Sequence, residues 1–148
     1  MARSNTTRRS AILEAFAEEF EKIDGGDGYK SDLSGAISTR MKFWDEVESF
    51  PALHMSAGSE TREYWGAGQK WRYLTVTFRI YVNSEEPIQE LEELLEDIET
   101  VIDDAGQFNY SHTEGTQNVA QVSIVSISTD EGVLQPLGVG EMIAEVRY

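Results

Sequence analysis

A segment near the middle of the chain alternates strictly between apolar and polar side chains. From Leu74 to Val82 every second residue is aliphatic or aromatic, and the residues between them are threonine, arginine or tyrosine. Successive side chains of a β-strand point to opposite faces, so this pattern predicts a long strand with one buried face. Such a strand needs neighbours and a covering layer, which limits the chain to folds that contain a sheet. The predicted strand runs from Trp71 to Val82.

Two other segments repeat their apolar residues at the spacing of an α-helix. The first runs from Thr7 to Ile23 and is followed by the glycine-rich turn Asp24–Gly28. The second begins near Ser84 and Pro87 and ends at Gly106, with glutamate and aspartate at most of its polar positions. Both segments predict amphipathic helices with one face buried against the sheet.

The remaining periodic segments predict shorter strands and two loops. Val122 and Ile124 would point to one side of their strand and Val125 and Ile127 to the other, which predicts a sheet covered on both faces. We therefore predict an α+β fold, in which an antiparallel or mixed sheet of four to five strands packs with two main helices. The whole chain, 1–148, is expected to form one domain, with residues 1–6 as a flexible arm. The expected strands are 37–47, 52–57, 119–129 and 141–148, and the loops are 58–70 and 130–140.

The charge of the chain excludes several classes of partner. Twelve Lys and Arg stand against 27 Asp and Glu among 148 residues, which gives a formal net charge of −15. A surface of this charge repels phosphate, so a protein that grips DNA or an anionic membrane is not expected. The absence of cysteine excludes disulfides, thiolate catalysis and cysteine-ligated zinc. No apolar run has the length of a membrane span.

No motif in the sequence indicates an enzyme. His54 and His112 have no partner at the spacing of a metal site, and no glycine-rich phosphate loop or serine elbow is present. The acidic residues lie mainly on the predicted solvent faces of the helices, where charge normally serves solvation. We predict no catalytic residue, no metal site and no cofactor.

Loops are therefore the first candidates for contacts with partners. Tyr64 and Trp65 lie in a glycine-bearing loop, where they either anchor an interface or pack back onto the core. Leu134 and Leu137 belong to an aliphatic group in the 130–140 loop, which is either a contact patch or a flap over the core. The basic N-terminal segment with Arg8 and Arg9 either reaches an acidic neighbour or is a frayed terminus.

The order of these features resembles a known family. It rests on four segments that follow one another along the chain: FPALHMSAGSE (50–60), YLTVTFRIYV (73–82), LEELLEDIETVI (91–102) and SISTDEGVLQPLGVGEMIAEVRY (126–148). Together they resemble the tail terminator proteins of long-tailed bacteriophages. The likeness spans nearly the whole chain and is densest from Tyr73 to the C-terminus, whereas residues 24–36 and 107–118 match nothing in it.

The resemblance implies a structural virion protein rather than an enzyme. Such a protein forms a ring, expected to be a homohexamer, on the head-proximal end of the completed tail tube. The ring ends tube polymerisation and offers a surface to the head-completion (stopper) protein, while DNA passes through its centre without adhering. The expected partners are a second copy, the tail tube protein and the stopper, with no membrane. The expected location is the tail neck of the virion, after synthesis in the host cytoplasm.

The resemblance also selects interface candidates and leaves two alternatives. The loops 59–70 and 129–141 would contact a neighbour, the tube or the stopper. Another phage neck protein, a stopper or connector adaptor, is the first alternative, and a small metal-dependent hydrolase that uses acidic residues is the second. The candidate interface residues are Arg8, Arg9, Tyr64, Trp65, Asp130, Glu131, Leu134, Pro136, Leu137 and Glu141.

Overall fold

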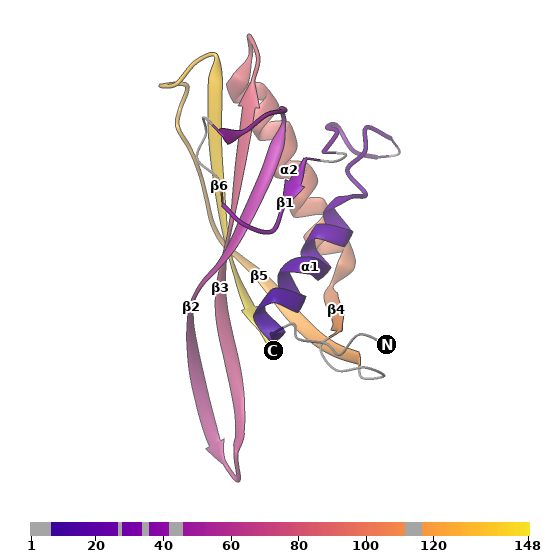
Figure 1. The fold of residues 1–148 in the computed structure, drawn as a ribbon, viewed down its shortest axis with the longest axis vertical. Coiled ribbons are helices and arrows are strands. Elements are labelled where there is room, and N and C mark those ends of the chain that lie inside the picture. Colours follow the sequence, from indigo (N-terminus) through magenta and orange to yellow (C-terminus); the bar gives the residue numbers. More distant parts are fainter. Residues whose placement is uncertain (1–6, 27, 34–35, 42–45, 112–116) are drawn as a thin grey trace.

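A six-stranded sheet carries two helices in the computed structural model (Figure 1). The structure describes residues 7–26, 28–33, 36–41, 46–111 and 117–148. Within them the strands lie in the order β1-β2-β3-β6-β5-β4, with β1 parallel to β2 and the other neighbours antiparallel. The elements are α1 (Arg8–Phe20), β1 (Ile37–Ser38), β2 (Ala52–Gly66), β3 (Gln69–Asn83), α2 (Pro87–Ala105), β4 (Gln107–Ser111), β5 (Gln117–Thr129) and β6 (Leu137–Arg147).

The α+β prediction with two main helices is confirmed, but the expected number of four to five strands is wrong. β4 was missed because five residues are too few to show a periodic pattern. The strand expected over 37–47 pairs only at Ile37 and Ser38, and residues 42–45 lie outside the described part. The predicted flexible arm, residues 1–6, also lies outside it.

Helix α1 buries an aromatic face against the sheet. Thr7 caps the helix, because its hydroxyl accepts a hydrogen bond from the Ser10 N–H at 3.1 Å. Phe16 and Phe20 then pack edge-on against Phe78 of β3, with ring centroids 5.1 and 5.3 Å apart. The helix ends at Phe20, three residues before the predicted end at Ile23.

Helix α2 packs against β6 at a glycine, Gly138. Pro87 stands in its first turn, and Gly106, with φ of 65°, ends it as predicted. A Cβ atom added to Gly138 of β6 would lie 2.8 Å from Val82 Cγ2 and 3.0 Å from Leu91 Cδ1. Glycine at this position therefore sets how closely the helix approaches the sheet.

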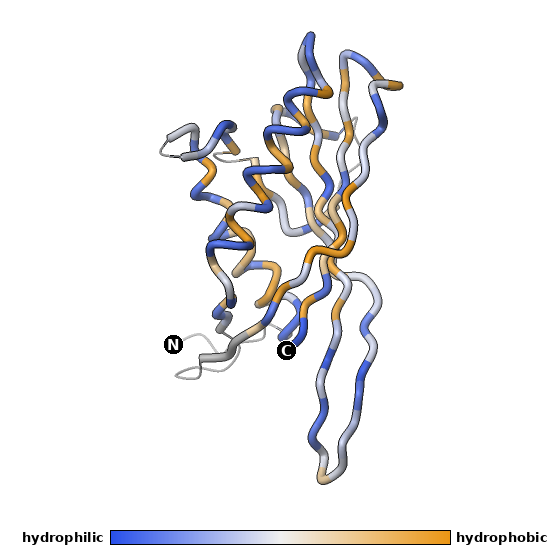
Figure 2. Tube along the Cα trace, turned by 180° about the vertical axis from the view of Figure 1, so that it is seen from behind, coloured by the Kyte–Doolittle hydropathy of each residue, from blue (hydrophilic) through white to orange (hydrophobic). Residues whose placement is uncertain are grey.

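Both helices cover the same face of the sheet (Figures 1 and 2). The opposite face is buried only in part, at Ala52, His54 and Tyr81, so the expectation of two covered faces does not hold along β5. The misleading pattern comes from a β-bulge. Ile124 pairs with Ala144 but Ser126 pairs with Ile143, so Val125 is an extra residue. The insertion returns Ile127 to the helix side opposite Met142 and leaves Val125 63% exposed.

The predicted loop over residues 58–70 is instead the distal half of a long hairpin. β2 and β3 continue to pair beyond a bulge between Ala57 and Glu60 and turn tightly after Gly66. Ala67 and Gly68 both have positive φ, 52° and 76°, as a type I′ turn requires. We call residues 59–72 the extended hairpin. It projects from the body and is mostly hydrophilic (Figure 2), and no core lies against it to impose an apolar alternation on its sequence.

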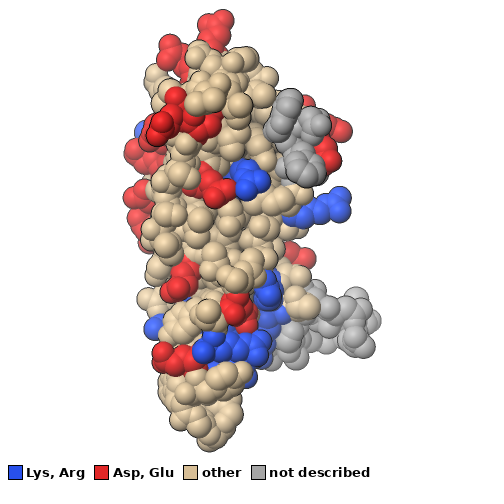
Figure 3. Space-filling view, turned by 90° about the vertical axis from the view of Figure 1, so that its left-hand side faces the viewer, with Lys and Arg blue, Asp and Glu red and all other residues tan. Residues whose placement is uncertain are grey.

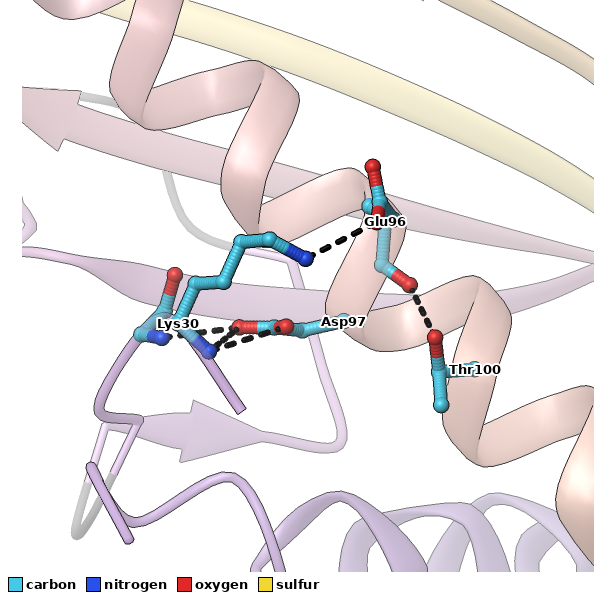
Figure 4. A network of polar contacts seen from close by, with 5 residues as sticks. Lys30, Glu96, Asp97 and Thr100 are labelled. Atoms are coloured by element: carbon cyan, nitrogen blue, oxygen red, sulfur yellow. Dashed lines mark hydrogen bonds and ion pairs between the residues drawn. The ribbon is translucent and has the colours of Figure 1, made fainter. Parts of the chain in front are cut away.

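A buried carboxylate fixes the segment after α1 onto α2 (Figure 4). Asp97 is 1% exposed and accepts hydrogen bonds from the backbone N–H groups of Lys30, at 2.9 and 3.1 Å, and Ser31, at 2.8 Å. The Lys30 ammonium group lies 2.8 Å from Glu96 one residue earlier in the helix. The backbone N–H groups of Lys30 and Ser31 have no strand to pair with in the described part of the chain, and the Asp97 carboxylate accepts their hydrogen bonds instead.

Candidate interaction surfaces

The predicted interface residues fall into two groups at opposite ends of the molecule. Tyr64 and Trp65 lie near the tip of the extended hairpin, and Arg8 and Arg9 lie on α1 beside its base. The other group lies on the turn between β5 and β6 and on the strand that follows it (Figure 1). The members of this second group are Asp130, Glu131, Leu134, Pro136, Leu137 and Glu141.

Aromatic and basic side chains alternate near the tip of the hairpin. Tyr64 is 63% exposed and Trp65 is 57% exposed, so neither packs back onto the core. Lys70 Nζ lies 5.7 Å from the Tyr64 ring centroid, and the rings of Trp65 and Trp71 lie 5.7 Å apart. A hydrogen bond with the Arg62 guanidinium lowers the pKa of the Tyr64 hydroxyl. These contacts hold the exposed rings without burying them.

An ionic cluster fixes the base of the hairpin. Glu60, directly after the bulge, accepts hydrogen bonds from the Tyr148 hydroxyl and from Arg62 Nε, the latter at 2.9 Å. Burial alone would raise the pKa of Glu60, but these two hydrogen bonds outweigh it and lower the pKa. Burial and the bond to Glu60 raise the pKa of Tyr148. Arg9 of α1 also donates to the Gly58 carbonyl, so the helix and the C-terminal strand both hold this base.

Positive charge gathers around the hairpin although the chain is strongly acidic. Six of the ten Lys and Arg in the described part of the chain lie on it or beside its base, and Figure 3 shows most of the visible blue atoms near this end. Trp71 and Trp65 border a shallow hollow of about 520 Å³ together with several of these cations. These residues lie around the β3 edge of the hairpin, because the register places Lys70 and Arg72 on one of its faces and Trp71 on the other. We call this set the basic–aromatic surface: Arg8, Arg9, Arg62, Tyr64, Trp65, Lys70, Trp71, Arg72 and Arg147.

Sequence reasoning found only four members of this surface. Arg147 and Arg72 were missed because they come from segments that meet only in the folded sheet. Arg147 lies over the Trp71 ring at 4.5 Å and Arg72 over the Tyr148 ring at 5.5 Å. The Gly66-Ala67-Gly68 run, flanked by aromatic and basic residues, was the one local signal of a hairpin tip.

The turn at the other end exposes aliphatic side chains on a rigid backbone. The Asp130 carboxylate accepts hydrogen bonds from the N–H groups of Leu134 at 3.1 Å and Val139 at 3.4 Å, so its oxygens stabilise the turn itself. Glu131 adopts a positive φ of 57°. Val133 is 81% exposed and Leu134 is 47% exposed, so these side chains do not fold over the core as a flap would.

The last two candidate residues lie on β6. Leu137 is half-buried at the start of the strand, and Glu141 forms an ion pair with Arg79 at 2.9 Å.

The outer face of α2 carries an uninterrupted acidic stripe. Four exposed acidic residues follow one another at intervals of four, three and four, which places them on one side of the helix. A shallow groove of about 650 Å³ near the start of the helix has further glutamates in its walls, Glu85, Glu86, Glu90 and Glu93. We define the acidic stripe as Glu92, Glu96, Glu99 and Asp103.

The described residues contain no candidate metal centre. Groups of three or more His, Asp or Glu that could hold a metal ion are absent from this part of the chain. His54 is buried beside the Tyr81 ring, 5.2 Å between centroids, and His112 lies outside the described residues. None of the described helices is long and apolar enough to cross a membrane.

Comparisons with known proteins agree on one family. A family model described as bacteriophage tail tube terminator protein matches residues 6–148. The tail tube terminator protein p142 of Escherichia phage T5 is 34% identical over 149 residues, which cover 95% of this chain and 92% of that protein. Both descriptions are those of structural tail proteins. The family match includes the extended hairpin, the acidic stripe and the turn between β5 and β6.

Proposed function

Because the chain belongs to the bacteriophage tail tube terminator family, we propose that it forms a ring on the head-proximal end of the tail tube. The ring ends polymerisation of the tube and then offers its other side to the head-completion (stopper) protein. The match to the family over residues 6–148 is the observation that carries this function. As a tail protein the chain is part of the virion; we place it at the neck, after synthesis in the host cytoplasm.

The distribution of the two candidate surfaces supports a ring with two different sides. A cap must contact the tube on one side and the next neck protein on the other. The extended hairpin and the turn 130–136 lie at opposite ends of the described structure and differ in chemistry, one basic and aromatic, the other aliphatic (Figures 1 and 3). We propose that the candidate residues at both ends form contacts between proteins, and that residues 1–148 act as one domain.

The net charge supports passage of DNA through the ring without adhesion. Each copy carries a formal charge of −15, so a hexamer would carry 6 × (−15) = −90. DNA binding gains free energy when basic groups displace counterions from phosphates, and a strongly acidic ring supplies little of this gain. We propose that double-stranded DNA is a passenger and not a ligand of this protein.

The alternatives fit less well. A stopper or connector adaptor would act on the portal side, whereas the family and the relative are both described as tube terminators. A metal-dependent hydrolase needs clustered ligands, and the acidic residues on the outside of α2 instead form a linear stripe. We propose a protein without enzymatic activity, metal or cofactor.

Tail length under depletion tests the proposed function. Tails assembled in infected cells that lack this protein are expected to vary widely in length and to carry no heads. Adding the purified protein to an extract of such cells should restore attached heads on tails that have not overgrown. Normal tail lengths in the depleted cells, measured by negative-stain microscopy, would contradict a role in termination.

A further inference from the structure

Beyond its base, the extended hairpin has no support from the described part of its own chain. β1 pairs with β2 only at Leu53 and His54, and the contact of the C-terminal segment with β3 ends at Arg72, which exchanges two backbone hydrogen bonds with Tyr148. Beyond these points both long edges of the hairpin lack a strand partner in the described part of the chain. Two-stranded hairpins are marginally stable in water by themselves. A hairpin that projects in this way gains stability when a second surface covers it.

The chemistry of the hairpin defines what that second surface must be. Its exposed rings offer flat apolar area, and Lys70 and Arg8 add positive charge beside them. The matching surface is elongated, acidic and able to shield aromatic rings. The acidic stripe of α2 is elongated and acidic, because its four carboxylates lie along one side of a helix nineteen residues long, and the methylene groups of its glutamate side chains can lie against aromatic rings.

We propose that the basic–aromatic surface of one copy binds the acidic stripe on α2 of a second copy. The inference deepens the proposed ring, on which it rests, by assigning the two surfaces that meet between neighbours. A closed ring needs a heterologous contact, in which one patch of each copy meets a different patch of the next. The hairpin and the stripe are two such patches of opposite charge, on separate parts of one chain.

Nucleic acid is the competing partner for a surface of this composition, and the contacts of its cations argue against it. Arg62 is bound to Glu60, while Arg72 and Arg147 lie over the rings of Tyr148 and Trp71. A phosphate-binding surface instead directs several cations at successive phosphates. With three guanidinium groups already engaged, the surface is better suited to a partner that supplies a few carboxylates.

The absence of cysteine allows a direct cross-linking test. One variant carries Gln69→Cys near the hairpin tip together with Glu92→Cys or Glu99→Cys on the stripe. The matched control combines Gln69→Cys with Glu18→Cys, which lies on the exposed face of α1. Each variant is treated with a short bismaleimide, both as concentrated protein and within purified tails.

The proposal predicts a ladder of multimers for the hairpin–stripe pairs, because each copy then links to two neighbours. The control pair and the single-cysteine variants should stop at dimers. Reversing the hairpin charge with Lys70→Glu should lower the yield of multimers about tenfold, since like charges would face each other. Adding Glu96→Lys to the same chain should restore the yield.

Three results would overturn the inference. They are the absence of a ladder in both free protein and tails, an equal ladder from the control pair, or a shift of the protein on duplex DNA at physiological salt that Lys70→Glu abolishes. Tail length separates this inference from the proposed function. If tails retain normal length and heads while no hairpin–stripe ladder forms, termination stands and the assignment of the surfaces fails.

Discussion

At the scale of single residues, buried carboxylates connect segments that are far apart in the sequence. Glu60 joins the base of the extended hairpin to the C-terminal residue Tyr148, and Asp97 joins α2 to the turn at Lys30 and Ser31. Neither role was predictable from the sequence, where both residues are ordinary members of acidic or polar stretches. Their importance depends on burial, which removes water as an alternative partner.

Tyr148→Phe tests the cluster at the hairpin base. Without the hydroxyl, the free energy of unfolding at neutral pH should fall by about 1–2 kcal/mol. Because the pKa of Glu60 is lowered in the folded protein, its contribution is present above the usual glutamate pKa and disappears as pH falls through the lowered value. The difference in stability between the wild type and the variant should therefore shrink as the pH falls through the lowered Glu60 pKa. Urea unfolding across pH, with Tyr73→Phe as control, measures both effects; identical curves for all three proteins would contradict the assignment.

Asp97→Asn tests the contact between α2 and the turn. Asparagine keeps the shape but replaces one acceptor oxygen by a donor that faces the N–H groups of Lys30 and Ser31. We expect a loss of about 1–3 kcal/mol in the free energy of unfolding. Glu99→Gln on the exposed side of the same helix should change it by less than about 0.5 kcal/mol. Equal effects of the two changes would show that the Asp97 carboxylate is not needed.

At the scale of elements, periodic sequence patterns identified the parts that touch the core and failed where no core is present. The β3 alternation and the apolar spacing of α2 appear in the structure because one face of each is buried. The distal half of the hairpin has no such constraint, while β1 and β4 are too short to show a periodic pattern, although Phe108 and Tyr110 of β4 are buried in the core. The bulge at Val125 shifted the alternation by one residue and made β5 look buried on both of its faces.

The packing of α2 on β6 yields a prediction at this scale. A methyl group at Gly138 would meet three neighbours at 2.8–3.1 Å, whereas at Gly140 the nearest atom is 3.2 Å away. Gly138→Ala should therefore lower the free energy of unfolding by about 1–3 kcal/mol through overpacking. Gly140→Ala should cost clearly less, since one leucine side chain can adjust. Thermal melts of the two variants compare them, and a larger loss at Gly140 would contradict the packing described.

At the scale of the whole molecule, the sequence predicted the fold class and the family, and its candidate residues include the exposed Tyr64, Trp65 and Leu134. It missed the projection of the hairpin and the gathering of cations beside it, because these depend on which strands become neighbours. Arg147 approaches Trp71 only after β6 has paired with β3. The interface roles of the candidate residues remain predictions, and the turn between β5 and β6 offers the simplest of them to test.

Leu134→Asp should impair assembly without unfolding the protein. The side chain is 47% exposed, so its replacement should leave the melting temperature near that of the wild type. If the turn contacts another protein of the neck, fewer complete particles should form. Val125→Asp, at the exposed bulge, is the control of similar chemistry. A strong loss of stability in Leu134→Asp would return this side chain to the core, and normal particle counts would remove the turn from the interface.

Imaging the protein on assembled tail tubes tests the central claim most directly. Tubes of the cognate tail tube protein are incubated with this protein bearing a gold label on a single engineered cysteine, which is possible because the native chain has none. The account predicts label at one end of each tube and no further growth from that end when tube subunits are added. Label scattered along the tube wall, or continued growth from a labelled end, would contradict a terminator.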